Sequence, residues 1–308
     1  MAKIATTHAE KNEMDCILFT TALQGYLNET KNRVSHPINV SRSKHLIAYF
    51  QGFTVQDIKR SHVRQYVRQR KQAGVTAHTI NGELRLISGV INQLNYDHDE
   101  NLPNPTLGNR EKKPRGRKRW ATVAEAKHLI QAASESKNPL LLPFIQLALA
   151  TGMRKGEILN LRWAQIDWES QTIYLNQTKN GDPASIPLNQ YALHALNTLK
   201  KYRVRSSTWV FSHPNGERLQ NIKNSFATAC KKAKIEGLTI HDLRRTVGSW
   251  LINSGERLEI VQEVLRHKDI GTTREYYAHL EKSKAREALE KLDNTKIYIL
   301  EDVNIRKR

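Results

Sequence analysis

The stretch that decides the fold is HDLRRTVGSWLINSGERLEIVQEVLRHKDIGTTREYYAHL, residues 241–280. His241 and Arg244 stand three positions apart, so they share a face if this stretch is helical. A short polar turn after His267 would fold Tyr276 back towards that histidine. Chemistry at a phosphate needs fixed positive charge beside a positioned hydroxyl, and this stretch offers both. The alternative is a basic helix that lies along nucleic acid while the tyrosines fill a core.

Composition limits the function classes. The chain has 308 residues, which suggests two domains, and 39% of them are hydrophobic, enough for proper cores. Lys and Arg number 49 against 30 Asp and Glu, a formal net charge of +19 that points to a polyanion, most often nucleic acid. No apolar run approaches membrane-spanning length, and no basic amphipathic helix or lipidation signal stands out, so we expect no membrane partner. The N-terminus lacks an export signal, and Cys16 and Cys230 lack metal-ligand spacing. We therefore expect a cytoplasmic protein that binds no metal.

Helical periodicity predicts a first domain over residues 15–103, after a flexible N-terminus at 1–14. Its expected helices cover 15–27, 41–50, 61–73 and 76–95. The clearest apolar face, in the last of them, consists of Ile80, Leu84, Ile87, Ile91 and Leu94.

A basic stripe runs along the third expected helix. It consists of Arg60, Arg64, Arg68 and Lys71, whereas Val63, Tyr66 and Val67 occupy a different face. A basic face opposite an apolar one suits a helix that lies on a phosphate backbone. An ordinary solvated surface is the alternative.

The segment 104–121 is rich in turn formers and contains the basic run KKPRGRKR, which includes Arg115 and Arg117. We interpret it as a linker between domains. Its arginines would neutralise phosphates if the two domains close around a duplex.

A second domain is expected over 122–293, followed by a tail at 294–308 that could include a last strand at 296–300. Expected strands at 171–176 and 184–188 form a hairpin with Lys179 near its tip. Expected helices cover 122–135, 140–150, 154–161, 190–203, 220–234, 240–254, 257–266 and 272–292. The predicted fold class is mainly α, with a helical DNA-binding domain followed by an α+β domain that carries a small antiparallel hairpin or sheet.

Four separated pieces now give a resemblance. They are TGMRKGEIL (151–159), the hairpin lysine, HDLRRT (241–246) and LRHKDIGTTREYY (265–277). In this order they resemble the tyrosine recombinases of the phage integrase family, and the first domain resembles that family's core-binding domain. The resemblance implies site-specific cleavage and rejoining of double-stranded DNA through a 3′-phosphotyrosyl intermediate, with no metal or nucleotide cofactor.

The resemblance also implies roles for individual residues. Arg154 and Arg244 would hold the scissile phosphate, which suits the planar, permanently charged guanidinium group. Lys179 would protonate the leaving 5′-oxygen. His241 would assist proton transfer, His267 would donate to the phosphate, and Glu157 would support the site.

Two features depart from the family pattern. Arg266 stands where the family usually has glycine, and it could add a phosphate contact or change how the turn packs. The nucleophile is also ambiguous, because two tyrosines are adjacent. The family spacing of nine positions from His267 selects Tyr276, whereas the trailing pattern Tyr-Ala-His selects Tyr277. We choose Tyr276, because geometry relative to the phosphate governs attack.

Three functions remain compatible with these motifs: an integrase of a phage or other mobile element, a Xer-type resolver of chromosome or plasmid dimers, and a DNA-binding protein of the same fold that has lost catalysis. The complete motif set argues against the last. Strand exchange between two duplexes implies a tetramer on DNA, with the tail at 294–308 as the expected contact between protomers. Little room precedes Asp15 for an arm-binding domain, so we expect core-site binding or dependence on accessory DNA-bending proteins.

Overall fold

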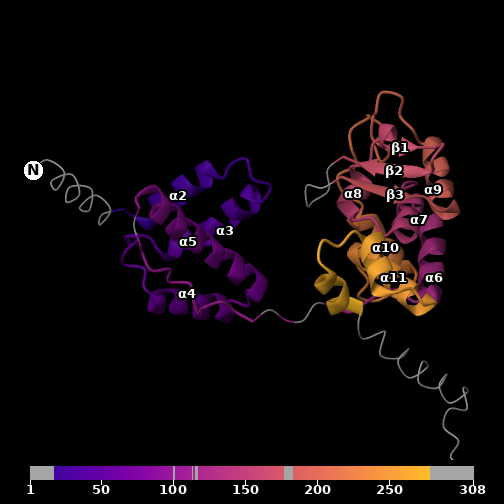
Figure 1. The fold of residues 1–308 in the computed structure, drawn as a ribbon. Helices are drawn as coiled ribbons and strands as arrows, with labels where there is room; N and C mark the ends of the chain where they lie inside the picture. The colour runs from indigo at the N-terminus through magenta and orange to yellow at the C-terminus, as the bar shows by residue number, and fades with distance from the viewer. Residues whose placement is uncertain (1–16, 100, 113, 115–116, 177–182, 278–308) are drawn as a thin grey trace, which may run out of the picture. The chain divides into compact units, whose positions relative to one another are not determined.

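The structure is a computed structural model that describes residues 17–277 apart from 100, 113, 115–116 and 177–182. It divides between Arg115 and Gly116 into two compact units, each of which is considered by itself (Figure 1). Within the described residues, no helix has the length and apolar character needed to cross a membrane.

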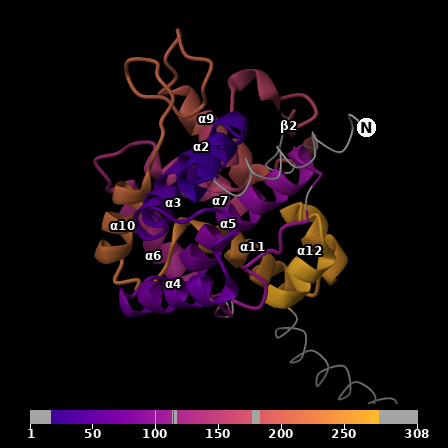
Figure 2. The same ribbon diagram turned by 90° about the vertical axis from the view of Figure 1, so that its left-hand side faces the viewer.

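The first unit packs four helices around one core, as the periodicity predicts. They are α2 (Phe19–Glu29), α3 (His36–Tyr49), α4 (Arg60–Gln72) and α5 (Ala77–Asp97). Thr76 begins α5 by accepting a hydrogen bond from the Thr79 backbone N–H at 3.4 Å. Figure 2 looks onto this unit, in which α5 packs against both α2 and α3.

A buried carboxylate ties α5 to α4. Glu83 is fully buried and accepts hydrogen bonds from Tyr66 Oη at 2.8 Å and from Arg70 Nε and Nη2 at 3.0 and 2.6 Å. Burial and the neighbouring Glu83 raise the pKa of the Tyr66 hydroxyl. Such a pair stabilises a unique packing only while both partners are present.

The segment expected to be a linker is attached at both ends. On the side of the first unit, Glu111 exchanges hydrogen bonds with the Asn81 side chain at 2.7 and 2.9 Å and pairs with Lys71 at 2.9 Å. On the side of the second unit, Arg117 bonds the Gly237 carbonyl oxygen and lies 3.8 Å from Asp242.

The second unit combines helices with a small sheet. Its helices are α6 (Val123–Ser134), α7 (Leu141–Thr151), α8 (Lys155–Leu159), the 3-10 turn η1 (Trp163–Gln165), α9 (Gln190–Lys200), α10 (Lys223–Lys232), α11 (Ile240–Ser254) and α12 (Leu258–Leu265). Residues 270–277 are also helical. The apolar helix α7 is the centre of the unit, because it packs against α6, α9 and α11.

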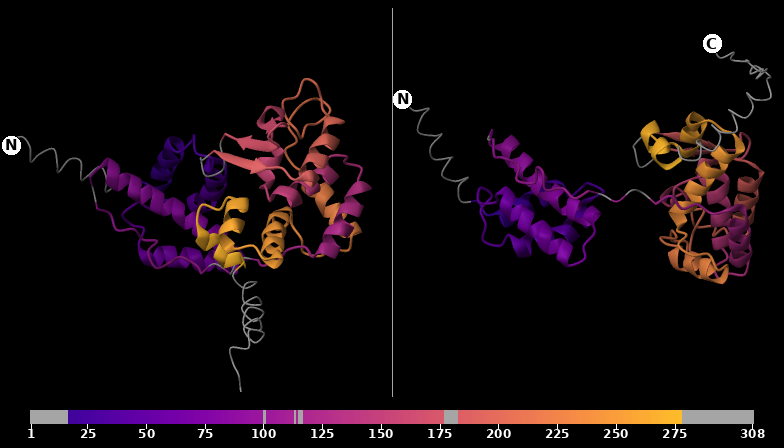
Figure 3. Two further views of the ribbon diagram at one scale, coloured as in Figure 1. Left: turned by 45° about the vertical axis from the view of Figure 1, so that its right-hand side comes forward. Right: turned by 90° about the horizontal axis from the view of Figure 1, so that it is seen from below.

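The sheet is antiparallel with the order β1-β2-β3, formed by β1 (Ile166–Asp167), β2 (Thr172–Leu175) and β3 (Ala184–Pro187). Ile173 faces Ile186 across the central pair, and both are buried. In Figures 1 and 3 the pink strands lie at one end of this unit, away from α6 and α10.

The fold class is therefore confirmed, with differences in detail. The structure adds β1, which is too short to show an alternating pattern. It begins α3 five residues before the expected start, because Pro37 is well suited to the first turn of a helix. The expected hairpin tip, the rest of the helix 272–292 and the strand 296–300 lie outside the described residues.

Candidate active site

A tight turn between α7 and α8 positions Arg154. Gly152 ends α7 with φ +61°, a left-handed conformation that glycine adopts without penalty. A Cβ at this position would lie 2.8 Å from Leu265 Cδ2, so the turn also requires a small residue. The chain then turns into α8, where Arg154 is the N-cap residue and its backbone N–H donates to Glu157 Oε2 at 2.8 Å.

Glu157 is shared by two guanidinium groups. Its Oε1 accepts from Arg154 Nη1 at 2.7 Å, and its Oε2 accepts from Arg266 Nη2 at 3.1 Å. Although burial opposes ionisation, these positive charges and the Arg154 backbone N–H lower the pKa of Glu157 overall. Glu157 is therefore a carboxylate at neutral pH, and it fixes the side chain of Arg154.

Arg244 reaches the same turn from α11. Its side chain is buried, and it donates to the carbonyl oxygens of Gly152, at 2.7 Å, and Leu265. Burial, together with the like charges of Arg154 and Arg266, lowers the pKa of Arg244 to about 9. The guanidinium is still protonated at neutral pH.

The N-terminus of α11 is held by a buried carboxylate that sequence reasoning missed. Asp242 accepts from Thr239 N at 2.8 Å and Oγ1 at 2.7 Å, and it pairs with Arg245 at 2.7 Å. The Thr239–Asp242 spacing is that of a capping box, so the sequence did contain the signal. His241 is the exposed neighbour of Asp242, and partial desolvation with the charges of Arg245 and Arg244 lowers its pKa.

His267 follows α12 and is oriented by the helix after it. Its Nδ1 lies 2.8 Å from the hydroxyl of Thr273, which is fully buried. Desolvation, then the positive charges of Arg244 and Arg154, lowers the pKa of His267 to about 4. The imidazole is thus neutral at physiological pH. If Thr273 donates to Nδ1, the proton of the ring stands on Nε2.

The two tyrosines differ in their surroundings. Tyr277 is 3% exposed, and its ring packs so closely on α11 that a Cβ at Gly248 would lie 2.4 Å from it. Burial raises the pKa of Tyr277 to about 12, although Arg244 and Arg245 oppose the shift. Tyr276 is half-buried, and the Arg245 guanidinium lies 4.9 Å from its ring centroid.

The structure thus gathers most of the expected residues of the second unit. Hydrogen bonds around the Gly152 turn link Arg154, Glu157, Arg244 and Arg266, either to one another or to backbone oxygens of the turn and of α12. His267 follows Arg266 directly in the chain. Lys179 and Arg115 lie outside the described residues. The four residues of the basic stripe are exposed on α4 in the first unit.

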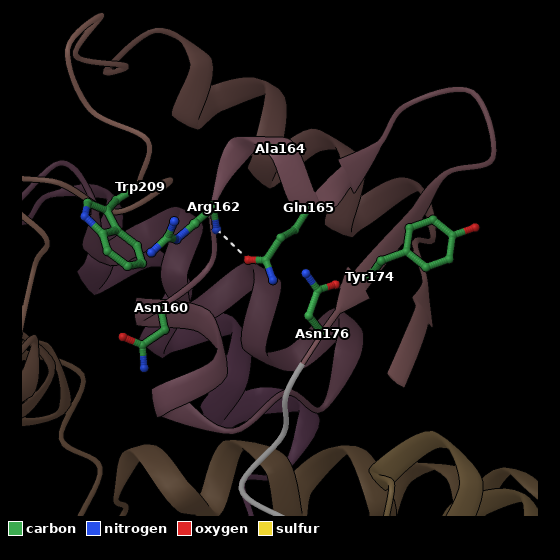
Figure 4. A pocket seen from close by; sticks show the side chains of 7 residues that line it. All are labelled: Asn160, Arg162, Ala164, Gln165, Tyr174, Asn176 and Trp209. Atoms are coloured by element: carbon green, nitrogen blue, oxygen red, sulfur yellow. Dashed lines mark hydrogen bonds between the residues drawn. The ribbon is translucent and has the colours of Figure 1, made fainter. Parts of the chain in front are cut away.

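A second polar surface was also missed. It is a hollow of about 590 Å³. Figure 4 shows Trp209 at one end of it and Tyr174, on β2, at the other. Arg162 lies between them, with its guanidinium 4.5 Å from the Trp209 ring, and Arg218 lies 5.8 Å from that ring. None of the described residues that line the hollow is acidic. No spacing in the sequence could reveal it, because tertiary folding brings Arg162 next to Trp209.

A larger groove of about 800 Å³ runs between β3 and helices α11 and α12. Its apolar lining includes Leu188, Val247, Leu251, Ile260 and Val264, and Arg266 also lines it.

The chain is similar to known proteins in both sequence and fold. The family model described as "Phage integrase family" matches residues 119–284. The integrase of Salmonella phage P22 is 30% identical over 191 residues, 57% of this chain and 47% of that protein. A shufflon-specific DNA recombinase of Escherichia coli is 31% identical over 221 residues, 71% of this chain and 54% of that protein. The chain therefore spans about half the length of these relatives. Among solved structures, a lambda integrase tetramer bound to a Holliday junction superposes with a TM-score of 0.66 at 19% identity, covering 83% of this chain and 76% of that one.

Proposed function

Because this chain belongs to the phage integrase family, we propose that it is a site-specific DNA recombinase that cleaves and rejoins strands through a 3′-phosphotyrosyl intermediate. The observation that carries the proposal is the convergence of Arg154, Arg244 and His267 on one turn. The tyrosine pair lies against α11, the helix that carries Arg244. The integrase and recombinase relatives support the same activity.

The arginines would bind the scissile phosphate and stabilise the charge that develops on its oxygens. Arg244 is anchored by carbonyl oxygens, which orient its guanidinium without cancelling its charge. His267, neutral and held by Thr273, would donate from Nε2 to a phosphate oxygen. His241 would assist proton transfer to or from the attacking hydroxyl.

The attacking hydroxyl belongs to the tyrosine pair, with Tyr276 as our choice and Tyr277 as the alternative. Attack on phosphorus forms the phosphotyrosyl bond and breaks the bond to the 5′-oxygen, which Lys179 would protonate as it leaves. The covalent link retains the energy of the broken phosphodiester. Rejoining to another 5′-hydroxyl therefore needs no external energy source.

Contacts with the duplex would come from exposed basic side chains. In the first unit these are the stripe of Arg60, Arg64, Arg68 and Lys71, helped by Arg115 and Arg117 between the units. In the second unit, the hollow beside Arg162 has the charge and the hydrogen-bond donors that a phosphate backbone needs.

The working assembly would be a tetramer on DNA, in which the tail at 294–308 docks on a neighbouring protomer. The apolar groove between β3 and α12 supports this proposal, because it could accept the apolar segment IYIL at 297–300. The lambda integrase tetramer supports it by fold similarity. We further propose that the protein is encoded by a phage or other mobile element. Accessory DNA-bending proteins would be its additional partners.

The experiment is incubation with a nicked suicide substrate, prepared from DNA that flanks the gene, followed by denaturing electrophoresis. A covalent DNA–protein band supports the recombinase. Binding of the DNA without such a band, at a neutral pH where Lys179 and the arginines are protonated, would instead identify a DNA-binding protein of the same fold. Recombination between two identical sites would favour the resolver, and recombination between unlike sites the integrase.

A further inference from the structure

Arg266 occupies an unusual backbone position at the edge of the site. It follows Leu265, the last residue of α12, with φ +52°, and its N–H donates to the Glu263 carbonyl oxygen at 2.9 Å. L-residues are strained in this left-handed conformation, so glycine would be the easier choice. Lys234 has a similar φ of +53°, so the backbone alone assigns no role, and the contacts of the Arg266 side chain decide it.

The side chain closes a ring of hydrogen bonds. Arg266 Nη2 donates to Glu157 Oε2 at 3.1 Å, and Arg154 Nη1 donates to Glu157 Oε1 at 2.7 Å. Arg154 Nη2 then donates to the backbone oxygen of Arg266 at 3.2 Å. A further bond from Arg266 Nη1 to the Val264 carbonyl oxygen, at 2.9 Å, fixes the guanidinium. The ring connects α8, which carries Arg154, to the residue that precedes His267.

We propose that Arg266 is a positioning residue, which holds Arg154 ready for the phosphate by occupying the second oxygen of Glu157. The inference rests on the proposed function. Without Arg266, only the Arg154 backbone N–H would hold Glu157 Oε2. This oxygen could then also accept from the Arg154 guanidinium, which would face both oxygens, as arginine and carboxylate pairs commonly do. That arrangement would withdraw donors from the phosphate. With Arg266 in place, the three side chains carry a net positive charge, and Arg154 keeps donors that are not used by Glu157.

The test compares Arg266→Gly with Lys234→Gly. Lys234 is a matched control, because it is an exposed cation with φ +53° in the same unit and lies outside the candidate site. Both substitutions relieve strain and remove one charge, but Arg266→Gly also loses the bonds to Glu157 and Val264. Some loss of melting temperature is therefore expected in that variant, and the rates are compared at a temperature where both variants are folded. DNA affinity at fixed salt should change similarly in the two variants, whereas the rate of covalent complex formation at saturating DNA should fall on the order of tenfold to a hundredfold in Arg266→Gly alone.

Two further variants separate positioning from general effects. Arg266→Lys keeps a charge beside Glu157 and should recover part of the rate. In a Glu157→Gln background, Arg266→Gly should cost little more, because the carboxylate that it restrains is gone. Equal cleavage by Arg266→Gly and Lys234→Gly would overturn the inference, and so would a slow Arg266→Gly that is unfolded at the assay temperature or has lost DNA binding in parallel.

If the wild-type protein forms no covalent complex, the proposed function fails, and a measurement without DNA then decides the inference. The NMR titration of His267 is suitable, because the charge of Arg266 contributes to lowering the pKa of that histidine. A higher His267 pKa in Arg266→Gly but not in Lys234→Gly would support the ring in solution. Identical titrations in the two variants would refute it.

Discussion

Substitution of each tyrosine of the adjacent pair by phenylalanine should identify the nucleophile. Tyr276→Phe and Tyr277→Phe remove only a hydroxyl, and the Tyr277 ring keeps its packing against Gly248. The free energy of unfolding should therefore change by no more than about 1 kcal/mol in either variant. Covalent complex formation should disappear in Tyr276→Phe and should largely persist in Tyr277→Phe.

The magnitude comes from the burial of Tyr277. Its pKa of about 12 lies two units above the ordinary value of 10. At about 1.4 kcal/mol per unit, forming the phenolate in this conformation costs about 3 kcal/mol more than it does for an ordinary tyrosine. Tyr277 would therefore need to move, or to lose its proton only as it attacks. One observation favours it nonetheless, since it is the tyrosine whose pKa Arg244 lowers.

The assay is the covalent band on a suicide substrate, with melting temperature and DNA affinity measured for each variant. Tyr191→Phe is the matched control, because Tyr191 is 79% exposed on α9, away from the site. If Tyr277→Phe abolishes the band and Tyr276→Phe does not, the nucleophile moves by one residue and the chemistry stands. If the double variant still forms the band, the tyrosine mechanism is refuted.

Three other experiments test separate parts of the molecule. Lys179→Ala should slow cleavage strongly, yet a substrate with sulfur as the 5′-leaving atom should restore the rate, because a thiolate leaves without a proton; no restoration would remove the lysine from that role. Glu83→Gln should lower the free energy of unfolding by about 3 kcal/mol or more, measured in urea, because Arg70 keeps a buried charge without its partner; a change below about 1 kcal/mol would contradict this. Replacing Arg64 and Arg68 by Ala should reduce the salt dependence of DNA affinity by roughly one to two units of slope; an unchanged slope would assign the stripe to solvent.

Acid should reveal the environment of His267 without any DNA. Its folded-state pKa of about 4 lies below the ordinary 6.5. Between those values the unfolded chain binds a proton that the folded protein does not, so the free energy of unfolding falls as the pH falls from 6.5 towards 4, by at most about 3 kcal/mol. His267→Gln should flatten this part of the pH profile, which is measured as the free energy of unfolding in urea at each pH. A profile with the same slope as the wild-type protein would contradict the assignment.

Sequence patterns predicted elements that repeat a signal over many residues. The helix α5 shows its apolar face over about four turns, and the strands β2 and β3 alternate on either side of a turn sequence. The short strand β1 could not be predicted, because Ile166 and Asp167 alone have no period. It forms because its residues pair with the edge of β2, and this pairing depends on tertiary structure.

The candidate site shows the same division. The order of the motifs in the sequence predicts Arg154, Arg244 and His267 as site residues. Their partners could not be foreseen, because Arg244 binds backbone carbonyl oxygens, and carbonyl oxygens leave no mark on a sequence. The left-handed backbone of Arg266 was equally hidden, since it depends on how α12 ends.

Two arginines with low exposure show how pairing separates a structural role from a functional one. In the first unit, Arg70 meets Glu83 with two hydrogen bonds, so its charge is cancelled and the pair can only hold α4 to α5. In the second unit, Arg244 is buried more deeply but donates to the carbonyl oxygens of Gly152 and Leu265. No ion pair to Arg244 occurs within the described residues. Burying an uncancelled charge costs stability, and the cost is repaid only if an anion arrives. The acceptors of Arg244 therefore support, independently of any motif, our proposal that this guanidinium binds an anion.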